Sequence, residues 1–218
     1  MITEERLQMK DAVQGILSKC FERHSELEQC RESLAAAFDV LVKCYREGRK
    51  LLICGNGGSA ADAEHIAGEL MNRFMLRRPL PQDFKERLGA DALQMAEKLQ
   101  QAFPAISLVS QNALTTAIAN DLGPDLIFAQ QVYGYGKKGD VLIALSTSGN
   151  SANVVNAIQV ARALDMKVIG LTGGTGGEIS ALSDVVLLVP SSITPVIQEM
   201  HLVLYHTLCA MVEIELFS

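Results

Sequence analysis

The stretch Lys50-Leu-Leu-Ile-Cys-Gly-Asn-Gly-Gly-Ser59 joins a short, almost wholly apolar run to a glycine-rich turn. A continuous apolar run of this length is typical of a strand that is buried on both faces of a parallel sheet. Four similar runs follow along the chain, and helix-length segments lie between them. Strands that alternate with helices predict an α/β fold with a doubly wound parallel sheet. The predicted strands are residues 50–54, 105–109, 140–145, 167–171 and 184–189.

Apolar residues recur at helical spacing before and between these strands. Residues 1–48 show this spacing twice, which predicts an N-terminal helical hairpin with the capping-box pattern Ser25-Glu-Leu-Glu28 between its helices and a stop at Gly48. An amphipathic stretch at residues 79–103 predicts a helical insertion before the second strand. No linker divides the chain, so we expect one domain over residues 1–218. Further helices are expected at about 59–78, 112–134, 150–164 and 175–182, and a long apolar one after Pro195.

The composition excludes several classes of protein. The 218 residues include 19 basic and 25 acidic side chains, and a net charge of −6 does not provide the positive surface that nucleic-acid binding needs. The N-terminus is charged where a signal peptide would be apolar, and the longest apolar stretches are interrupted or too short to cross a bilayer. Five cysteines without a C-x-x-C pair favour reduced thiols. We therefore expect a soluble cytoplasmic protein that binds neither nucleic acid nor membranes.

The turn after the first strand matches the dinucleotide-binding pattern G-x-G-x-x-A at Gly55, Gly57 and Ala60. That pattern also needs an acidic residue at the end of a second strand about 20 residues later, where this chain is still expected to be helical. We therefore interpret the glycines as allowing backbone N–H groups to approach a ligand at the start of the next helix. A tight turn with Ser59 as N-cap and Asp62 completing a capping box is compatible with such a site.

The turn after the third strand, Ser146-Thr-Ser-Gly-Asn-Ser151, sets four hydroxyl groups around a glycine. Hydroxyls, backbone N–H groups and the dipole of the following helix together form a phosphate site. No Lys or Arg occurs from Gly139 to Ala161, which disfavours nucleoside triphosphate hydrolysis and favours a phosphate monoester. The simpler interpretation, a turn capped by Ser151, accounts for only one of the hydroxyls.

Two predicted helices carry residues that suit acid-base or metal chemistry. His65 and Glu69 are four residues apart and share one helix face, so both can reach one substrate atom or one metal ion. The alternative is a solvated stripe in which Glu69 pairs with Arg73. The helix after Pro195 is apolar nearly all round and must be buried, so we expect one of its two histidines to be structural. Its polar residues include Gln198, Glu199, His201 and His206.

Taken together and in this order, these residues resemble the sugar isomerase (SIS) fold and, within it, the phosphoheptose isomerase family. The resemblance covers nearly the whole chain. It implies a five-stranded parallel sheet flanked by helices, a homotetramer with active sites near subunit boundaries, and aldose-ketose isomerisation of a sugar phosphate through an enediol. The implied substrate is sedoheptulose 7-phosphate, and the product is D-glycero-D-manno-heptose 7-phosphate. The matching residues are Cys54-Gly-Asn-Gly-Gly-Ser59, His65-x-x-x-Glu69, Asn120-Asp121, Ser146-Thr-Ser-Gly-Asn-Ser151, Ile197-Gln-Glu-Met-His201 and His206.

The resemblance also implies roles for individual residues. Glu69 would be the carbon base, and His206 its acid-base partner. One zinc ion per subunit would be held by His65, Glu69, Gln198 and His206. Eight residues of straight helix separate Gln198 from His206 by about 12 Å, so both reach one ion only if the glutamine extends far or the helix deviates. The residues that would contact the substrate are Asn56, Gly57, Gly58, Glu69, Asn120, Asp121, Ser146, Thr147, Ser148, Ser151 and Gln198.

Two features depart from the family pattern. The insertion at residues 79–103 enters near the active-site face, and Pro195 stands where some members carry an acidic residue, which removes one possible substrate contact. Two non-catalytic alternatives share the fold. One is a relative that binds the replication initiator protein, in which the residue matching His206 is not a histidine. The other is a sugar-phosphate-binding regulator that needs no metal, and loss of activity on chelation would separate the enzyme from it.

Overall fold

In the computed structural model, which describes residues 9–218, the five apolar runs form one all-parallel sheet. The strand order is β2-β1-β3-β4-β5, and the predicted doubly wound α/β fold is confirmed. β1 pairs with β2 on one side and with β3 on the other, so the strand order reverses between β1 and β3. The strands are β1 (Leu51–Cys54), β2 (Ala105–Ser107), β3 (Val141–Leu145), β4 (Lys167–Gly173) and β5 (Val185–Val189).

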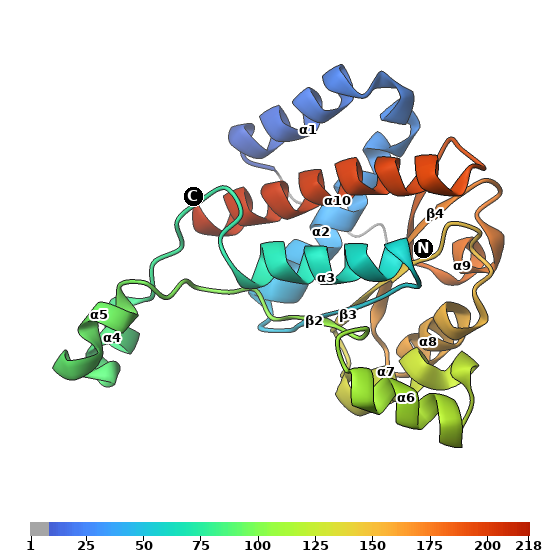
Figure 1. Cartoon of the computed structure of the whole chain (residues 1–218). Helices are drawn as coiled ribbons and strands as arrows, with labels where there is room; N and C mark the ends of the chain where they lie inside the picture. Colours follow the sequence, from blue (N-terminus) through green and yellow to red (C-terminus); the bar gives the residue numbers. More distant parts are fainter. Residues whose placement is uncertain (1–8) are drawn as a thin grey trace.

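Two layers of helices cover the sheet, one on each face (Figure 1). Successive strand residues point to opposite faces, so Leu51 and Ile53 enter the core of the first layer and Leu52 and Cys54 that of the second. The first layer holds α1 (Asp11–Arg23), α2 (Arg31–Arg46), α3 (Gly58–Met71) and α10 (Thr194–Phe217). The second holds α6 (Asn112–Asp121), α7 (Ile127–Tyr135), α8 (Ala152–Ala163) and α9 (Gly177–Leu182).

The expected hairpin at residues 1–48 needs two corrections, and its first eight residues lie outside the described part of the chain. α1 packs mainly against α10 rather than against α2 (Figure 1). The predicted capping box is wrong, because Ser25–Cys30 forms a 3-10 helix with no side-chain cap and Glu28 pairs with Arg31 instead, at 2.5 Å. The stop at Gly48 is confirmed: α2 ends at Arg46, and Gly48 takes a φ of +67°.

The helix predicted at 112–134 is broken in the structure. α6 ends at Asp121, and a 3-10 turn at Pro124–Leu126 separates it from α7. The cause is local: Gly123 takes a φ of +124°, and Pro124 has no N–H to continue the helical bonding.

The helix predicted at 59–78 ends at Met71, because the next residues bind a buried carboxylate on α10. Glu213 accepts hydrogen bonds from the backbone N–H groups of Phe74, Met75 and Leu76 at 2.6–3.0 Å. Arg78 donates to the same carboxylate at 2.6 Å and to the carbonyl oxygens of Glu69 and Leu70, and neither side chain of the ion pair is exposed. This pair therefore fastens the end of α3 to α10.

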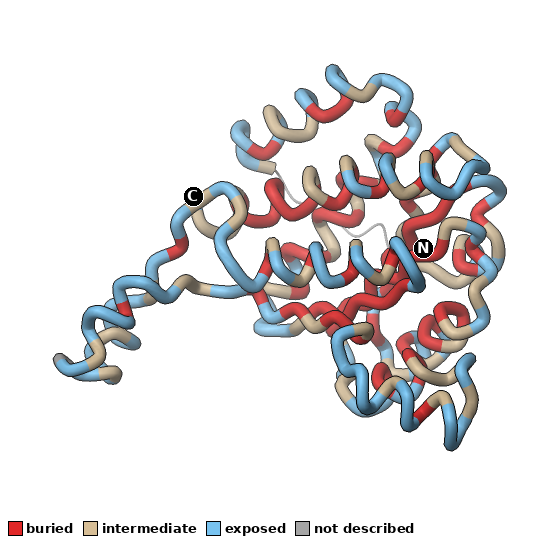
Figure 2. The backbone as a smooth tube through the Cα atoms, viewed as in Figure 1, coloured by how far each residue is buried: buried red, intermediate tan, exposed pale blue. Residues whose placement is uncertain are grey.

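The insertion at 79–103 is helical, as expected, and forms an arm that projects from the body of the protein (Figure 1). It contains α4 (Gln82–Leu88), a 3-10 turn (Ala90–Ala92) and α5 (Leu93–Ala96). An antiparallel bridge between Pro79 and Gln100 closes its base, directly beside Arg78. Most of the arm is exposed (Figure 2). Its exposed apolar side chains are Phe84, Leu93, Met95 and Leu99.

α10 is the central helix of the first layer. Within residues 9–218 it is the one helix long and apolar enough, by length and composition, to cross a membrane, although Glu199, His201, His206 and Glu213 interrupt its apolar sequence. However, 56% of its most apolar window is buried within the protein, as in a core helix (Figure 2). The five cysteines are free and buried, as expected, and burial raises the pKa of the Cys54 thiol to about 12.

His201 is the structural histidine of α10, with 0% exposure. Burial lowers its pKa to about 4, an effect that the Thr172 backbone partly offsets. Because an unfolded histidine titrates near 6.5, the unfolded state takes up this proton first, and the fold loses stability as the pH falls below about 6.5. We expect a loss of up to about 1.4 kcal/mol per pH unit, or about 3 kcal/mol by pH 4.

Denaturant unfolding of wild type and His201→Gln between pH 7 and pH 4.5 checks this expectation. The variant should lack this part of the pH dependence. Parallel pH profiles for the two proteins would contradict it.

Candidate active site

The glycine-rich turn after β1 and the hydroxyl-rich turn after β3 lie side by side, because the two strands are neighbours and end at the same edge of the sheet. The strand order reverses at this point, which is where open α/β sheets bind ligands. Two hydrogen bonds of 2.9 Å between the carboxamides of Asn56 and Asn153 join the two turns. Asn153, which the sequence analysis missed, therefore holds Asn56 at the junction.

The start of α3 differs from the predicted capping box. The N-cap residue is Gly57, with a φ of +57°, and no side chain caps the helix. Ser59 lies buried in the first turn, and the Asp62 carboxylate bonds to α10 instead. At Gly58, a Cβ atom would lie 2.5 Å from Nε2 of Gln198. The side chain of Gln198 therefore lies directly against the first turn of α3.

The turn after β3 brings its hydroxyl groups together. Ser146 Oγ and Ser151 Oγ are 3.0 Å apart, and the exposed Ser148 Oγ accepts a hydrogen bond from the Asn150 N–H. Ser151 occupies the N-cap position of α8, as expected, but its hydroxyl makes no capping bond. Gly149 has a φ of +69°, and a Cβ there would lie 2.0 Å from the Gly176 carbonyl oxygen, so only glycine fits. Thr147 completes the set of predicted substrate contacts in this turn.

His65, Glu69 and His206 form one cluster between α3 and α10. Their ligand atoms all lie within 4.8 Å of one another. His65 Nε2 is 3.0 Å from Glu69 Oε1 and 3.3 Å from His206 Nε2. Glu69 thus contacts His65 rather than pairing with Arg73, which was the alternative interpretation. Two helices that are far apart in the sequence bring a carboxylate and two imidazoles to one point.

The chemistry of this donor set fits a divalent metal ion such as zinc, which accepts imidazole nitrogen and carboxylate oxygen ligands. Gln198 is in a different place. It contacts Gly58, seven residues before His65 on α3, and that separation corresponds to about 10 Å of helix rise. The structure therefore brings three of the four predicted metal ligands together and places Gln198 beside the glycine-rich turn.

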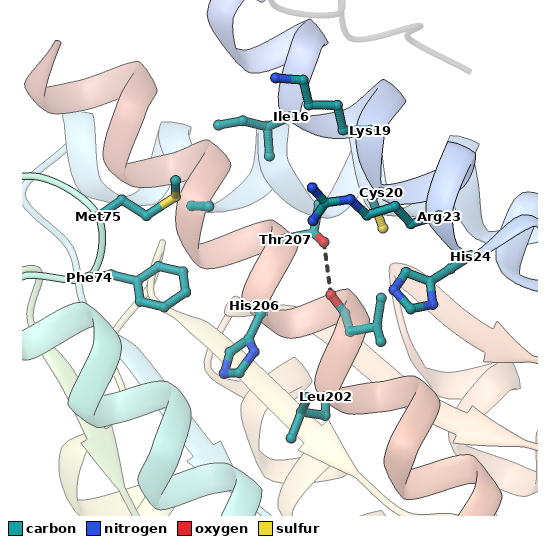
Figure 3. Close-up of a pocket in the computed structure, with 12 residues that line it drawn as sticks. Ile16, Lys19, Cys20, Arg23, His24, Phe74, Met75, Leu202, His206 and Thr207 are labelled. Carbon is teal, nitrogen blue, oxygen red and sulfur yellow. Dashed lines mark hydrogen bonds between the residues drawn. The ribbon is translucent and has the colours of Figure 1, made fainter.

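The environment of His206 favours its neutral form. Burial lowers the pKa of this imidazole, the neighbouring His65 lowers it further, and Glu69 opposes the change. His206 lines a cavity of about 560 Å³ between α1 and α10. Figure 3 shows the side chains around it. Lys19 and Arg23 line the same cavity from α1. His206 thus has access to both the cavity and the cluster.

Two residues behind the cluster complete it and were not predicted. Tyr205 on α10 is buried, and its hydroxyl lies 3.1 Å from Asp62 Oδ1 and 3.0 Å from His65 Nδ1. A sequence signal existed for both: Asp62 precedes His65 by three residues on the same helix face, and Tyr205 is the residue before His206.

Asn120 and Asp121 lie apart from the cluster. They are exposed at the end of α6, in the second helical layer, and the Asn120 amide donates to Asp121 Oδ1 at 2.8 Å. Apart from this bond between the two, no side-chain hydrogen bond within residues 9–218 joins Asn120 or Asp121 to any other predicted substrate contact.

Comparison with known proteins agrees with this geometry. The SIS domain profile matches residues 17–102 and 84–173. The chain is 43% identical to the phosphoheptose isomerase of Aliarcobacter butzleri, over 87% of this chain and 89% of that protein. It is 40% identical to the phosphoheptose isomerase of Rhodospirillum rubrum, over 96% of this chain and 100% of that protein. The solved phosphoheptose isomerase of Neisseria gonorrhoeae is 36% identical, with a TM-score of 0.72 over 93% of this chain and 97% of that one.

Proposed function

The chain belongs to the phosphoheptose isomerase family of SIS-domain proteins, which are aldose-ketose isomerases of sugar phosphates, and we propose that it converts sedoheptulose 7-phosphate to D-glycero-D-manno-heptose 7-phosphate through an enediol. The observation that carries the proposal is the convergence of His65, Glu69 and His206, with the first of them on the helix that begins at the glycine-rich turn. The family relatives at about 40% identity favour the enzyme over a replication-initiator-binding protein or a sugar-phosphate regulator.

The proposed reaction moves one proton between adjacent carbons. The Glu69 carboxylate removes a proton from C1 of the ketose, and the C–H electron pair forms the C1–C2 double bond as the C2 carbonyl oxygen takes up a proton. Glu69 then returns a proton to C2, while the C1 hydroxyl loses its proton and becomes the aldehyde. His206 carries the proton between the two oxygens, a role that suits an imidazole whose environment favours the neutral form. No net proton is gained or lost.

We include a zinc ion in this proposal. His65, Glu69 and His206 would hold it, with Gln198 left as a substrate contact or a more distant ligand. When bound, the ion would supply a positive charge that polarises the substrate carbonyl. Activity on heptulose, pentulose and hexulose phosphates, measured with and without a chelator, tests the function. We expect the heptulose phosphate to be preferred and chelation to abolish turnover, which zinc should restore. Full activity in metal-free protein would contradict the metal assignment.

The phosphate group is assigned to the turn Ser146–Ser151. Losing one hydroxyl that donates to a charged oxygen costs about 1.5–3 kcal/mol, so Ser148→Ala or Ser151→Ala should raise KM about tenfold or more. Steady-state kinetics with sedoheptulose 7-phosphate checks this. Ser33→Ala is the matched control, because that hydroxyl bonds only to the Cys30 carbonyl at the start of α2. An unchanged KM in both turn variants would place the phosphate elsewhere.

We also propose a homotetramer with active sites near subunit boundaries. Apolar side chains are exposed around the cavity at His206: Met75 is 61% and Leu202 is 40% accessible. Neighbouring subunits would cover such a surface. Sedimentation of the purified protein should give four times the chain mass of 23.6 kDa, whereas a fully active monomer would contradict the proposal.

A further inference from the structure

A buried hydrogen-bond chain lies behind the His65-Glu69-His206 cluster. The Tyr205 side chain, only 1% exposed, places its hydroxyl between Asp62 Oδ1 at 3.1 Å and His65 Nδ1 at 3.0 Å. The Tyr205 and His65 rings meet edge-on, with their centroids 5.6 Å apart. The other ring nitrogen of His65, Nε2, faces Glu69 and His206. The chain therefore approaches His65 from the side opposite to the cluster.

The number of protons available decides the direction of these bonds. The Tyr205 hydroxyl has one proton, and an ionised carboxylate can only accept. Burial raises the pKa of Asp62, and the hydrogen bond from Tyr205 and the nearby His65 oppose this only in part. The Tyr205 hydroxyl donates to Asp62 Oδ1 at 3.1 Å, so its oxygen is left to accept the second bond. The donor of that bond must be the N–H at Nδ1 of His65.

We propose that Asp62 and Tyr205 are positioning residues that hold His65 in its Nδ1–H tautomer, with the Nε2 lone pair directed at the point where Glu69 and His206 converge. This inference rests on the proposed function, in which that point receives a metal ion. Neutral imidazole in water prefers the opposite tautomer, with the proton on Nε2, and in metal-free protein Glu69 Oε1, 3.0 Å from Nε2, would accept a hydrogen bond from that tautomer. The Asp62-Tyr205 chain would thus supply the preference that makes Nε2 a ligand, in the way that outer hydrogen bonds orient metal-binding histidines.

Two substitutions separate the roles of the two residues. Tyr205→Phe keeps the ring and removes the acceptor for the Nδ1 proton. Asp62→Ala removes the carboxylate and frees the Tyr205 hydroxyl to donate to Nδ1, which should move the His65 proton to Nε2. Both variants should therefore shift His65 to the Nε2–H tautomer. In Asp62→Ala the contact between Tyr205 and His65 stays in place. Tyr133→Phe on α7 is the matched control, because that side chain is 69% exposed.

The tautomer is read from nitrogen-15 NMR spectra of the four imidazoles in metal-free protein, about two pH units above the usual histidine value of about 6.5. His65→Gln assigns the signal of interest. The expected wild-type result is a proton on Nδ1 of His65. Zinc affinity, measured by competition with a chromophoric chelator, should fall about 10- to 100-fold in both variants and stay unchanged in Tyr133→Phe. Melting temperatures of the metal-free proteins show whether each variant is folded. If Tyr205→Phe does not fold, the result for Asp62→Ala alone tests the inference.

An Nε2–H tautomer in the wild type, or an Nδ1 proton that survives in both variants, would overturn the inference. Failure of the proposed metal site has a different signature: wild type and His65→Gln would then bind zinc equally, while the tautomer measurement would still decide the role of Asp62 and Tyr205.

Discussion

Replacing Glu69 with glutamine is expected to lower kcat by about 10²- to 10⁴-fold, because this is what a carboxylate contributes when it acts as a general base in proton transfer. Glutamine keeps the size of the side chain and one oxygen but cannot take up the C1 proton. In the structure one oxygen of Glu69 lies 3.0 Å from His65, so the variant keeps a partner for that imidazole. Steady-state kinetics on sedoheptulose 7-phosphate measures the loss.

The same helix offers a control. Glu64→Gln changes an exposed carboxylate of α3 whose partner is the Ser110 hydroxyl at 3.0 Å, and we expect wild-type kcat. Metal content, determined for both variants, distinguishes a missing base from a missing ligand. A Glu69→Gln enzyme that keeps its metal and the wild-type kcat would contradict the assignment of the base.

Breaking the buried ion pair of Arg78 and Glu213 is expected to lower the free energy of unfolding by about 3–5 kcal/mol. Burial alone would raise the pKa of Glu213, but the Phe74 and Met75 N–H groups and Arg78 hold it below its usual value. Arg78→Met would leave that carboxylate buried without its cation. It would also remove the donor to the Glu69 and Leu70 carbonyl oxygens at the end of α3.

An exposed pair on the arm is the matched control. Arg87 and Asp83 are 3.4 Å apart, with side chains that are 71% and 75% exposed, so Arg87→Met should cost only about 0–1 kcal/mol. Denaturant unfolding at one fixed protein concentration measures both, since assembly makes stability depend on concentration. Equal stability losses in the two variants would show that the buried pair does not hold α3 against α10.

Local sequence patterns were sufficient for the sheet and for the places of the two turns that follow β1 and β3. Each strand is a short apolar run that begins and ends within about two residues of its predicted bounds, because burial on both faces leaves a clear signal. The pair His65 and Glu69 was also visible, because residues four apart share a helix face. These features depend on neighbours in the sequence.

Features that depend on distant contacts could not be predicted in this way. In the sequence, Arg78 is the second residue of the pair Arg77-Arg78. Its ion-pair partner, Glu213, is 135 residues away. The end of α3 at Met71, where Asn72 is the C-cap, coincides with that contact, and no glycine or proline follows before Pro79. Asp62 was assigned to a capping box from the local pattern. Its partner in the structure, Tyr205, is 143 residues further on and could not be found in that way.

The position of Gln198 could be predicted only in part. About 12 Å of helix rise separates Gln198 from His206. In the structure the Gln198 side chain lies against Gly58 instead of joining the cluster. Its separation from the cluster could be anticipated from helix geometry, whereas its contact required the packing of α10 on α3.

Proton NMR of sedoheptulose 7-phosphate turned over by this protein in D2O tests most directly whether the cluster transfers a carbon-bound proton through an enediol. We expect deuterium at C2 of the aldose product and at C1 of the recovered ketose with the wild-type enzyme, and at neither carbon with Glu69→Gln. Turnover of the sugar phosphate without any deuterium at either carbon, or equal incorporation by the variant, would contradict this expectation.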